Sequence, residues 1–205
     1  MGFLRDEQIN YLNFLEKENL LSLNNGHDYI GSGSMGYTRT LPRPDKKPGE
    51  PITGHDLWVL SESQETVGVG PDMFAEFVLP HQKSIVERFG KCYYGCCEPL
   101  HLRMPLLKEN LPNLARVSVS PWADEEIMAQ ECGREIAYSR KPHPALVSTT
   151  DFDEAAIRAD IEKTLTIARG CRVEFALKDV HTLDGKPERL ARWVYIAREA
   201  IGRGA

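Results

Sequence analysis

The sequence lacks the features of a membrane, secreted or nucleic-acid-binding protein. No run approaches the roughly 20 apolar residues of a transmembrane helix. The N-terminus turns charged by Arg5, where a signal peptide would continue into an apolar segment. The net charge is -5, and no stripe of Lys and Arg could neutralise phosphates. We therefore expect a cytoplasmic protein that binds neither membranes nor nucleic acid.

Cysteine is scarce, and the standard zinc motifs are missing. The chain has five cysteines, an odd number, with no C-x-x-C and no H-E-x-x-H spacing. Without a secretory signal, these thiols are expected to be free in a reducing compartment. A dinucleotide site is also not expected. Residues 31–36 match G-x-G-x-x-G, but Pro42 and Pro44 forbid the helix that such a site requires.

Composition and periodicity indicate a single α/β domain over residues 1–205. The chain is 41% hydrophobic and 27% charged, which is ordinary for a globular protein. Helical and extended patterns alternate, which favours a parallel sheet with helical crossovers. We expect a long ordered loop at about 26–56, because this segment is rich in Gly, Pro and Ser. The expected strands are 20–25, 57–60, the segment from Lys91, 116–121, 135–139 and 173–180. The expected helices are 5–18, the segment from Pro71 with a restart at Pro80, a short turn at 106–108, 123–133, 152–169 and 187–201.

One stretch, Lys91–His101, concentrates reactive side chains. It holds three thiols, two phenols, a carboxylate and an imidazole. In parallel sheets, functional residues gather at the carboxyl ends of the strands. We therefore expect this strand to deliver its last residues to a pocket. The polar residues at the expected strand ends are Cys96, Cys97 and Glu98; Ser118, Ser120 and Asp124; Arg140, Lys141 and His143; and Lys178, Asp179 and His181.

Two questions stay open from the residues alone. Zinc binds thiolate, imidazole and carboxylate ligands, so Cys96 or Cys97 with Glu98 and His181 would form a three-ligand set. The alternative is that these cysteines are small core hydrophobes near a strand end. The second question concerns the last strand, where Glu174 and Lys178 share one face. Charges buried there require partners, either in a structural ion pair or in catalysis.

Five stretches in order resemble the uroporphyrinogen decarboxylase superfamily, which includes the corrinoid-linked methyltransferases. They are Phe77–Lys83, Tyr93–Pro99, Val117–Asp124, Lys141–Pro144 and Val173–Thr182. The resemblance implies a TIM-barrel-like (β/α) barrel that is incomplete, with about six of eight strands. It implies that the first two strands of the barrel are absent. The N-terminal arginines that bind substrate carboxylates in the decarboxylase would then be absent too. Open sheet edges pair readily, so we expect a homo-oligomer or a partner that supplies the N-terminal half.

The resemblance also suggests a metal site. The methyltransferase branch holds zinc with a His-x-Cys pair and a distant Cys, and zinc lowers the pKa of a thiol that then accepts a methyl group. Cys96 matches the paired Cys, Tyr94 stands where the His would be, and His181 falls close to the distant ligand. The expected metal ligands are Cys96, Cys97, Glu98 and His181. The expected catalytic residues are Glu98, Lys178, Asp179 and His181.

Three functional hypotheses follow. The first is a zinc-dependent methyltransferase that acts on a small molecule with a corrinoid protein or a thiol acceptor. The second is a porphyrinogen decarboxylase, in which Arg140, Lys141, Lys178 and His181 would supply cations and an acid. The third is an inactive or split barrel fragment that needs an N-terminal partner.

Overall fold

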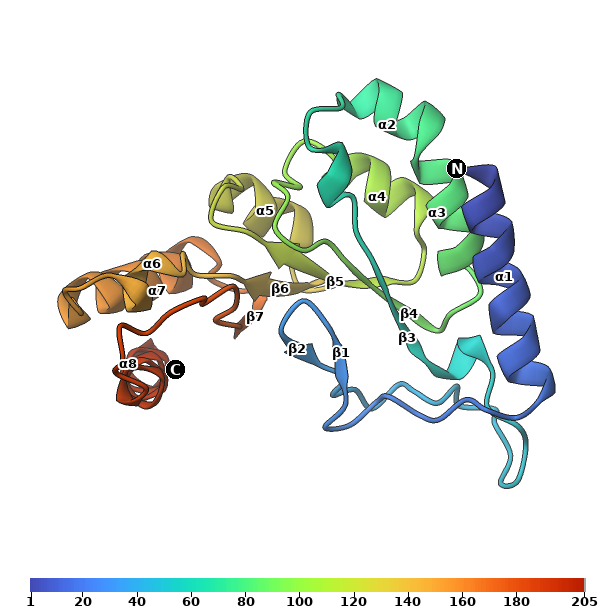
Figure 1. Cartoon of the computed structure of the whole chain (residues 1–205), viewed down its shortest axis with the longest axis horizontal. Helices are drawn as coiled ribbons and strands as arrows, with labels where there is room; N and C mark the ends of the chain where they lie inside the picture. The colour runs from blue at the N-terminus through green and yellow to red at the C-terminus, as the bar shows by residue number, and fades with distance from the viewer. Residues whose placement is uncertain (205) are drawn as a thin grey trace.

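The chain folds around one parallel sheet of five strands, seen in a computed structural model that describes residues 1–204 (Figure 1). The strand order is β3-β4-β5-β6-β7, which is also the order along the chain. The α/β fold and its parallel sheet are therefore confirmed. The strands are β3 (Trp58–Ser61), β4 (Lys91–Tyr94), β5 (Leu114–Val119), β6 (Ala137–Arg140) and β7 (Arg172–Phe175).

Helices connect each strand to the next. Helices α2 to α5 lie on one side of the sheet, and α6 to α8 gather beyond β7 (Figure 1). The helices are α1 (Gly2–Lys17), α2 (Pro71–Phe77), α3 (Leu79–Val86), α4 (Met104–Asn110), α5 (Glu125–Cys132), α6 (Ala145–Ser148), α7 (Glu154–Ile167) and α8 (Glu188–Gly204). Short 3₁₀ turns occur at Gly54–Asp56 and Gln64–Thr66. The expected restart near Pro80 is confirmed, because α2 ends at Phe77 and Pro80 occupies the first turn of α3.

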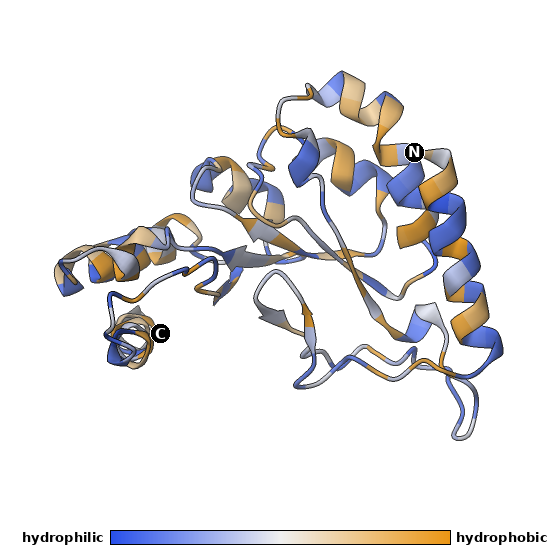
Figure 2. Ribbon diagram, viewed as in Figure 1, coloured by the Kyte–Doolittle hydropathy of each residue, from blue (hydrophilic) through white to orange (hydrophobic). Residues whose placement is uncertain are grey.

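The two faces of the sheet differ in chemistry because side chains alternate along each strand. One face carries the buried residues Cys92, Tyr94, Val117, Val119 and Tyr138, which pack against α3, α4 and α5 in the main core. Figure 2 shows apolar residues along the strands and on the helices that cover them. The other face is more polar, and we call it the inner face.

A hairpin covers the inner face. It consists of β1 (Tyr29–Gly31) and β2 (Ser34–Met35) and lies on the side of the sheet opposite α2 to α5 (Figure 1). The expected long loop at 26–56 thus contains two short strands. The tip requires glycine at position 33, where φ is +81° and an added Cβ would lie 3.4 Å from the Ala176 Cβ.

The expected strand at 20–25 is wrong, so the parallel sheet has five strands where we expected six. This segment instead bonds to one residue at the outer edge of β3, Trp58, through one side chain. The Asn24 amide donates to the Trp58 carbonyl at 3.0 Å, and its oxygen accepts from the Trp58 N–H at 2.9 Å. A side chain here replaces a ladder of backbone hydrogen bonds. The last strand is also shorter than expected and ends at Phe175.

A second core joins α7 and α8. Ile157 and Ile161 pack against Trp193, Ile196 and Ala197. Three other apolar side chains of α8, Leu190, Val194 and Ile201, are exposed. Ile127 of α5 is likewise exposed, whereas the neighbouring Met128 is buried.

Two expectations about membranes and thiols can be compared with the structure. Within residues 1–204, no helix is both long enough and apolar enough to span a bilayer. The five cysteines are all free.

Candidate functional site

Four reactive side chains meet at the carboxyl end of the sheet. Cys96 and Cys97 follow β4, and Lys178 and Asp179 follow β7. The Lys178 ammonium donates to Cys96 Sγ at 2.8 Å, and the Cys97 thiol donates to Asp179 Oδ2 at 3.0 Å. The two sulfur atoms lie 3.7 Å apart. We call these four residues the thiol site.

The chain after β7 brings Lys178 across the sheet to the thiols. The Ala176 N–H donates to the Arg140 carbonyl at 3.0 Å, which continues the pairing with β6 for one residue. Asp179 then takes a left-handed backbone conformation with φ of +58°. Aspartate tolerates this conformation better than most residues. The turn places two groups from positions 178 and 179 against two thiols 82 residues away.

A small cavity of about 40 Å³ opens beside the thiol site. Its walls include Trp122, which is 60% exposed, and the buried Lys141. Pro121, Pro142 and Pro144 complete the wall. A space of this size admits a water molecule or a methyl-sized group. The arrangement therefore presents a sulfur atom and an ammonium group to a small reactant.

The electrostatics of the site favour a charged Lys178. Burial lowers the pKa of Lys178, but its hydrogen bonds and charge interactions with Cys96 and Cys97 outweigh burial and raise that pKa above its ordinary value. The second thiol behaves differently. Burial raises the pKa of Cys97, and the hydrogen bond to Asp179 raises it further, to about 12. Cys97 is therefore a neutral thiol near pH 7.

Asp179→Asn is expected to make Cys97 more reactive. The substitution removes the carboxylate whose hydrogen bond adds to burial in raising the pKa of Cys97, so more thiolate is present at pH 8. In a Cys96→Ser background, we expect alkylation of Cys97 by iodoacetamide to accelerate about three- to tenfold, since one pKa unit corresponds to a tenfold change. Without the Asp179 change, the rate should rise roughly tenfold per pH unit from pH 7 to 10. The rate is measured by peptide mass spectrometry.

Asp184→Asn is the matched control for this experiment. Asp184 lies in the same segment, is exposed, and has a similar φ of +57°, but it pairs with Lys186. It should leave the Cys97 rate unchanged. Equal rates in the two variants would show that Asp179 does not control Cys97.

Glu98, expected as a ligand and catalytic group, is buried and accepts hydrogen bonds from the backbone and from Ser63. It is 1% exposed, and its carboxylate accepts from the Ser63 N–H at 2.7 Å, the Ser63 hydroxyl at 3.2 Å and the Cys96 N–H at 2.8 Å. Arg103 donates to the same Ser63 hydroxyl at 2.7 Å. Glu98 therefore anchors the backbone that carries Cys96.

His181 lies apart from the thiol site. Its side chain is exposed, and none of the hydrogen bonds among the described residues joins it to Cys96 or Cys97. The other expected histidine at a strand end, His143, is also exposed, with its ring 5.6 Å from that of Trp122.

The described residues do not assemble the expected zinc set. The 3.7 Å between Cys96 and Cys97 sulfur atoms suits two thiolates on one tetrahedral zinc, for which bonds of about 2.3 Å imply a separation near 3.8 Å. However, no group of three or more His, Cys, Asp and Glu side chains in residues 1–204 lies in an arrangement that could hold a metal ion.

A buried polar network, which sequence reasoning missed, lies under the hairpin next to the thiol site. Ser34 and Ser139 each donate to Glu174 Oε1 at 2.5 Å. The Lys141 ammonium donates to the Ser139 hydroxyl at 2.6 Å, and the Tyr93 hydroxyl donates to the same Ser139 hydroxyl at 3.3 Å. We call Ser34, Tyr93, Ser139, Lys141 and Glu174 the hairpin cluster. The alternation along β4, β6 and β7 was the available signal, because Tyr93, Ser139 and Glu174 all fall on the inner face.

Glu174 and Lys178, expected on one face, have different partners. Glu174 forms an ion pair with Arg116 at 3.5 Å, whereas Lys178 forms an ion pair with Asp179 at 3.5 Å and contacts the thiols. Lys141 is only 2% exposed, and burial lowers its pKa against the opposing effect of Tyr93. Burial raises the pKa of Tyr93, but the Lys141 charge and the hydrogen bonds outweigh it and lower that pKa. Such coupled groups beside a cavity are typical of functional sites.

Other polar residues at the strand ends have structural roles. Arg140 lies on the opposite face and pairs with Glu125 at 3.1 Å and Asp160 at 3.2 Å. Asp124 caps α5 by accepting from two backbone N–H groups at 3.0 Å. The Ser118 hydroxyl donates to the Cys96 carbonyl at 2.6 Å and so helps to fix the thiol loop.

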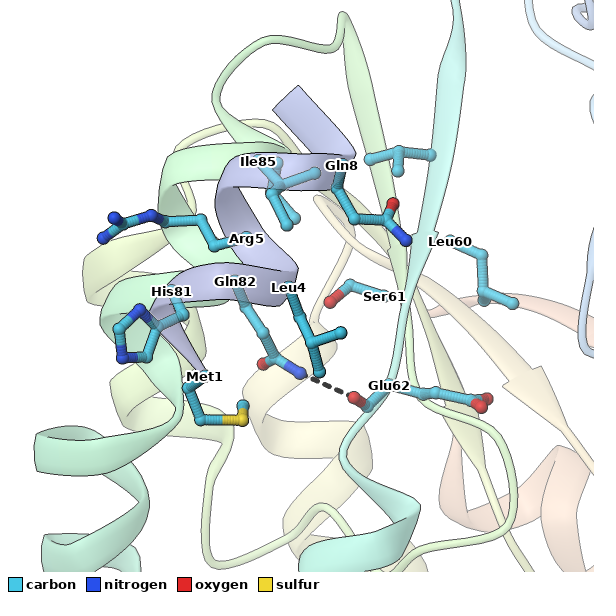
Figure 3. Close-up of a pocket in the computed structure, with 12 residues that line it drawn as sticks. Met1, Leu4, Arg5, Gln8, Leu60, Ser61, Glu62, His81, Gln82 and Ile85 are labelled. Carbon is cyan, nitrogen blue, oxygen red and sulfur yellow. Dashed lines mark hydrogen bonds between the residues drawn. The ribbon is translucent and has the colours of Figure 1, made fainter. Parts of the chain in front are cut away.

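A larger cavity of about 260 Å³ lies elsewhere, between α1, α3 and β3 (Figure 3). Leu4 points into it, and the Gln82 amide donates to the Glu62 carbonyl at 2.6 Å across its floor. Its lining includes Arg5, Glu62 and His81 but no cysteine. The reactive chemistry therefore lies at the smaller cavity.

Comparison with known proteins adds no relationship. No protein-family model matches the chain, and no curated protein is significantly similar to it. The superfamily resemblance thus depends on the five sequence stretches described above.

Proposed function

We propose that the chain is a methyl-transfer enzyme related to the uroporphyrinogen decarboxylase superfamily, and that its sheet is part of a (β/α) barrel. Two features support the barrel. Parallel strands follow one another in sequence order, as they do when a barrel winds. The reactive residues follow the carboxyl ends of β4 and β7, where barrel enzymes carry their sites.

The contact between Lys178 and Cys96 carries the functional proposal. An ammonium group 2.8 Å from a sulfur atom stabilises negative charge on that sulfur. Cys96 is only partly buried and lines the cavity, so a substrate thiol at the cavity mouth can approach its sulfur atom. Cys97 supplies a neighbouring neutral thiol. Cys96 therefore acts as the base that activates the substrate thiol. Lys178 holds its positive charge beside the Cys96 sulfur atom.

The substrate thiol gives its proton to the Cys96 thiolate. The resulting substrate thiolate attacks the methyl carbon of a methylated corrinoid protein, and a sulfur–carbon bond forms. The bond between the methyl group and its carrier breaks, and both electrons stay on the carrier. Cys96 then releases its proton to solvent.

Zinc stays a prediction of the resemblance. A zinc ion here would need further ligands besides the Cys96 and Cys97 thiols. The decarboxylase alternative has fewer cations than expected, because Arg140 is committed to Glu125 and Asp160 on the far face. The need for a partner is supported by the two edges of the sheet at β3 and β7. We therefore include a homo-oligomer or an N-terminal partner in the proposal.

The test is transfer of a methyl group from methylcobalamin to 2-mercaptoethanol. The rate is measured from the absorbance change of the corrinoid. We expect Cys96→Ser to lower the rate by about 10²-fold, the usual size of a general-base effect. Lys178→Met should lower it by roughly tenfold, for one lost charge interaction. Cys171→Ser, which alters a partly buried thiol outside the site, should have no effect.

Two outcomes would overturn this proposal. One is a Cys96→Ser variant that keeps the parent rate. The other is a methyl group found on Cys96 itself by peptide mass spectrometry, because a base is not methylated.

A further inference from the structure

We propose that a cleft at the amino end of the sheet, opposite the thiol site, binds a small phosphorylated molecule. The cleft has a volume of about 720 Å³, within the range of about 300–1,000 Å³ typical of ligand sites. Its charged lining residues are Arg39, Lys91, Arg116, Arg172 and Glu135. This cationic cleft is a second site, beyond the proposed methyl transfer.

The charge balance of the cleft is the first observation. Four cations face one carboxylate, in a chain whose net charge is -5. Arg116 is paired with Glu174 at 3.5 Å. Among the described residues, Arg39, Lys91 and Arg172 have no carboxylate within the 4.0 Å of an ion pair. Three positive charges are therefore left for a ligand.

The strand register is the second observation. Arg116, Ala137 and Arg172 are direct partners across β5, β6 and β7, so their side chains share the inner face. Lys91 is the direct partner of Trp58 on the same face. Rigid strands thus hold three of the cations, which lowers the cost of ordering them on binding.

Trp58 supplies the third observation. The Lys91 ammonium lies 5.7 Å from its ring centre, and the Arg116 guanidinium lies 5.0 Å from it. These cation–π contacts fix both charges near one aromatic surface. Burial and the charge of Arg172 lower the pKa of Lys91, so the two cations already repel one another. A dianion between them would relieve that repulsion.

Phosphate is the anion that fits this lining best. Guanidinium groups bind phosphate oxygens through two parallel hydrogen bonds, and a lysine adds a point charge. The exposed Arg39 lies on the loop that borders the cleft and can close on a bound group. A compact molecule with a terminal phosphate or diphosphate therefore matches both the volume and the charges.

The test uses inorganic pyrophosphate with the full chain in isothermal titration calorimetry. We expect saturable binding at one site, and Arg172→Met should weaken it about tenfold, for one charge-assisted contact. Arg172 is exposed, so this variant should keep its fold. Arg169→Met removes the same charge from an exposed position outside the cleft and should bind like the parent. Cys96→Ser should also bind like the parent, which separates this site from the methyl-transfer site.

Three results would overturn the inference. They are the absence of saturable binding, equal weakening in the Arg172 and Arg169 variants, and equal heat from sodium chloride at the same ionic strength. Tighter binding of an acidic peptide than of pyrophosphate would show that the cleft serves a protein and would overturn the phosphate assignment.

Discussion

Replacing Glu98 with alanine is expected to lower the free energy of unfolding by about 3–5 kcal/mol. The Glu98 carboxylate is 1% exposed and accepts three hydrogen bonds, two from Ser63 and one from the Cys96 N–H. Alanine would leave two buried N–H groups unpaired and would remove the charge that faces Arg103. Chemical denaturation measures the change, and the melting temperature should fall by roughly 6–20 °C.

Glu65→Ala is the matched control for this prediction. Glu65 is exposed in the 3₁₀ turn Gln64–Thr66, two residues from Ser63. Its replacement should change the free energy of unfolding by less than about 0.5 kcal/mol. If Glu98→Ala also costs less than about 1 kcal/mol, Glu98 is not the anchor of the thiol loop. Its expected role as a ligand or catalytic group would then regain support.

Arg140→Met is expected to cost a similar amount, about 3–5 kcal/mol. Arg140, the last residue of β6, is buried against helices α5 and α7. It pairs there with Glu125 of α5 at 3.1 Å and with Asp160 of α7 at 3.2 Å. It also donates to the Thr164 hydroxyl at 3.2 Å. Methionine would fill the space but would leave two carboxylates without their main counter-charge.

The pH dependence of this loss follows from Glu125. Burial raises the pKa of Glu125, but the Thr164 hydrogen bond and the Arg140 charge outweigh it and lower that pKa. The stability that this ionised group contributes is present above its unfolded pKa near 4.5 and is lost as pH falls through the lowered folded value. The difference between parent and variant should therefore be largest above about pH 5 and smaller in acid.

Arg134→Met is the control for Arg140, because it removes the same charge from an exposed position before the same strand. It should leave stability within about 0.5 kcal/mol of the parent. A loss in Arg140→Met that does not depend on pH would show that packing, and not charge, determines the effect.

Local pattern predicted much of the fold. Helical periodicity located the helices that became α1, α5, α7 and α8, and the apolar runs located β3 to β7. The meeting of Cys96 and Cys97 with Lys178 and Asp179 was also within reach. All four follow parallel strands, whose carboxyl ends lie at one edge of the sheet.

The remaining features depend on tertiary contacts that no local pattern records. The segment at 20–25 has a strand-like composition, but Asn24 pairs with Trp58 through its side chain. Glu98 turns to Ser63, from a segment 35 residues earlier in the chain. His181 and Lys178 are equally polar, and only the irregular path after β7 places Lys178 on the thiols.

The order of the strands also sets the order in which the molecule can assemble during synthesis. Each strand of the sheet pairs with the next one along the chain, so the sheet can grow unit by unit from its N-terminal edge. The Ser34–Glu174 bond, in contrast, joins residues 140 positions apart, and Cys96 and Lys178 are 82 positions apart. Neither contact can form until β7 and the segment after it have been synthesised. A nascent chain that has completed four strands thus carries its thiols without the lysine, and it acquires the paired site only when the last strand docks.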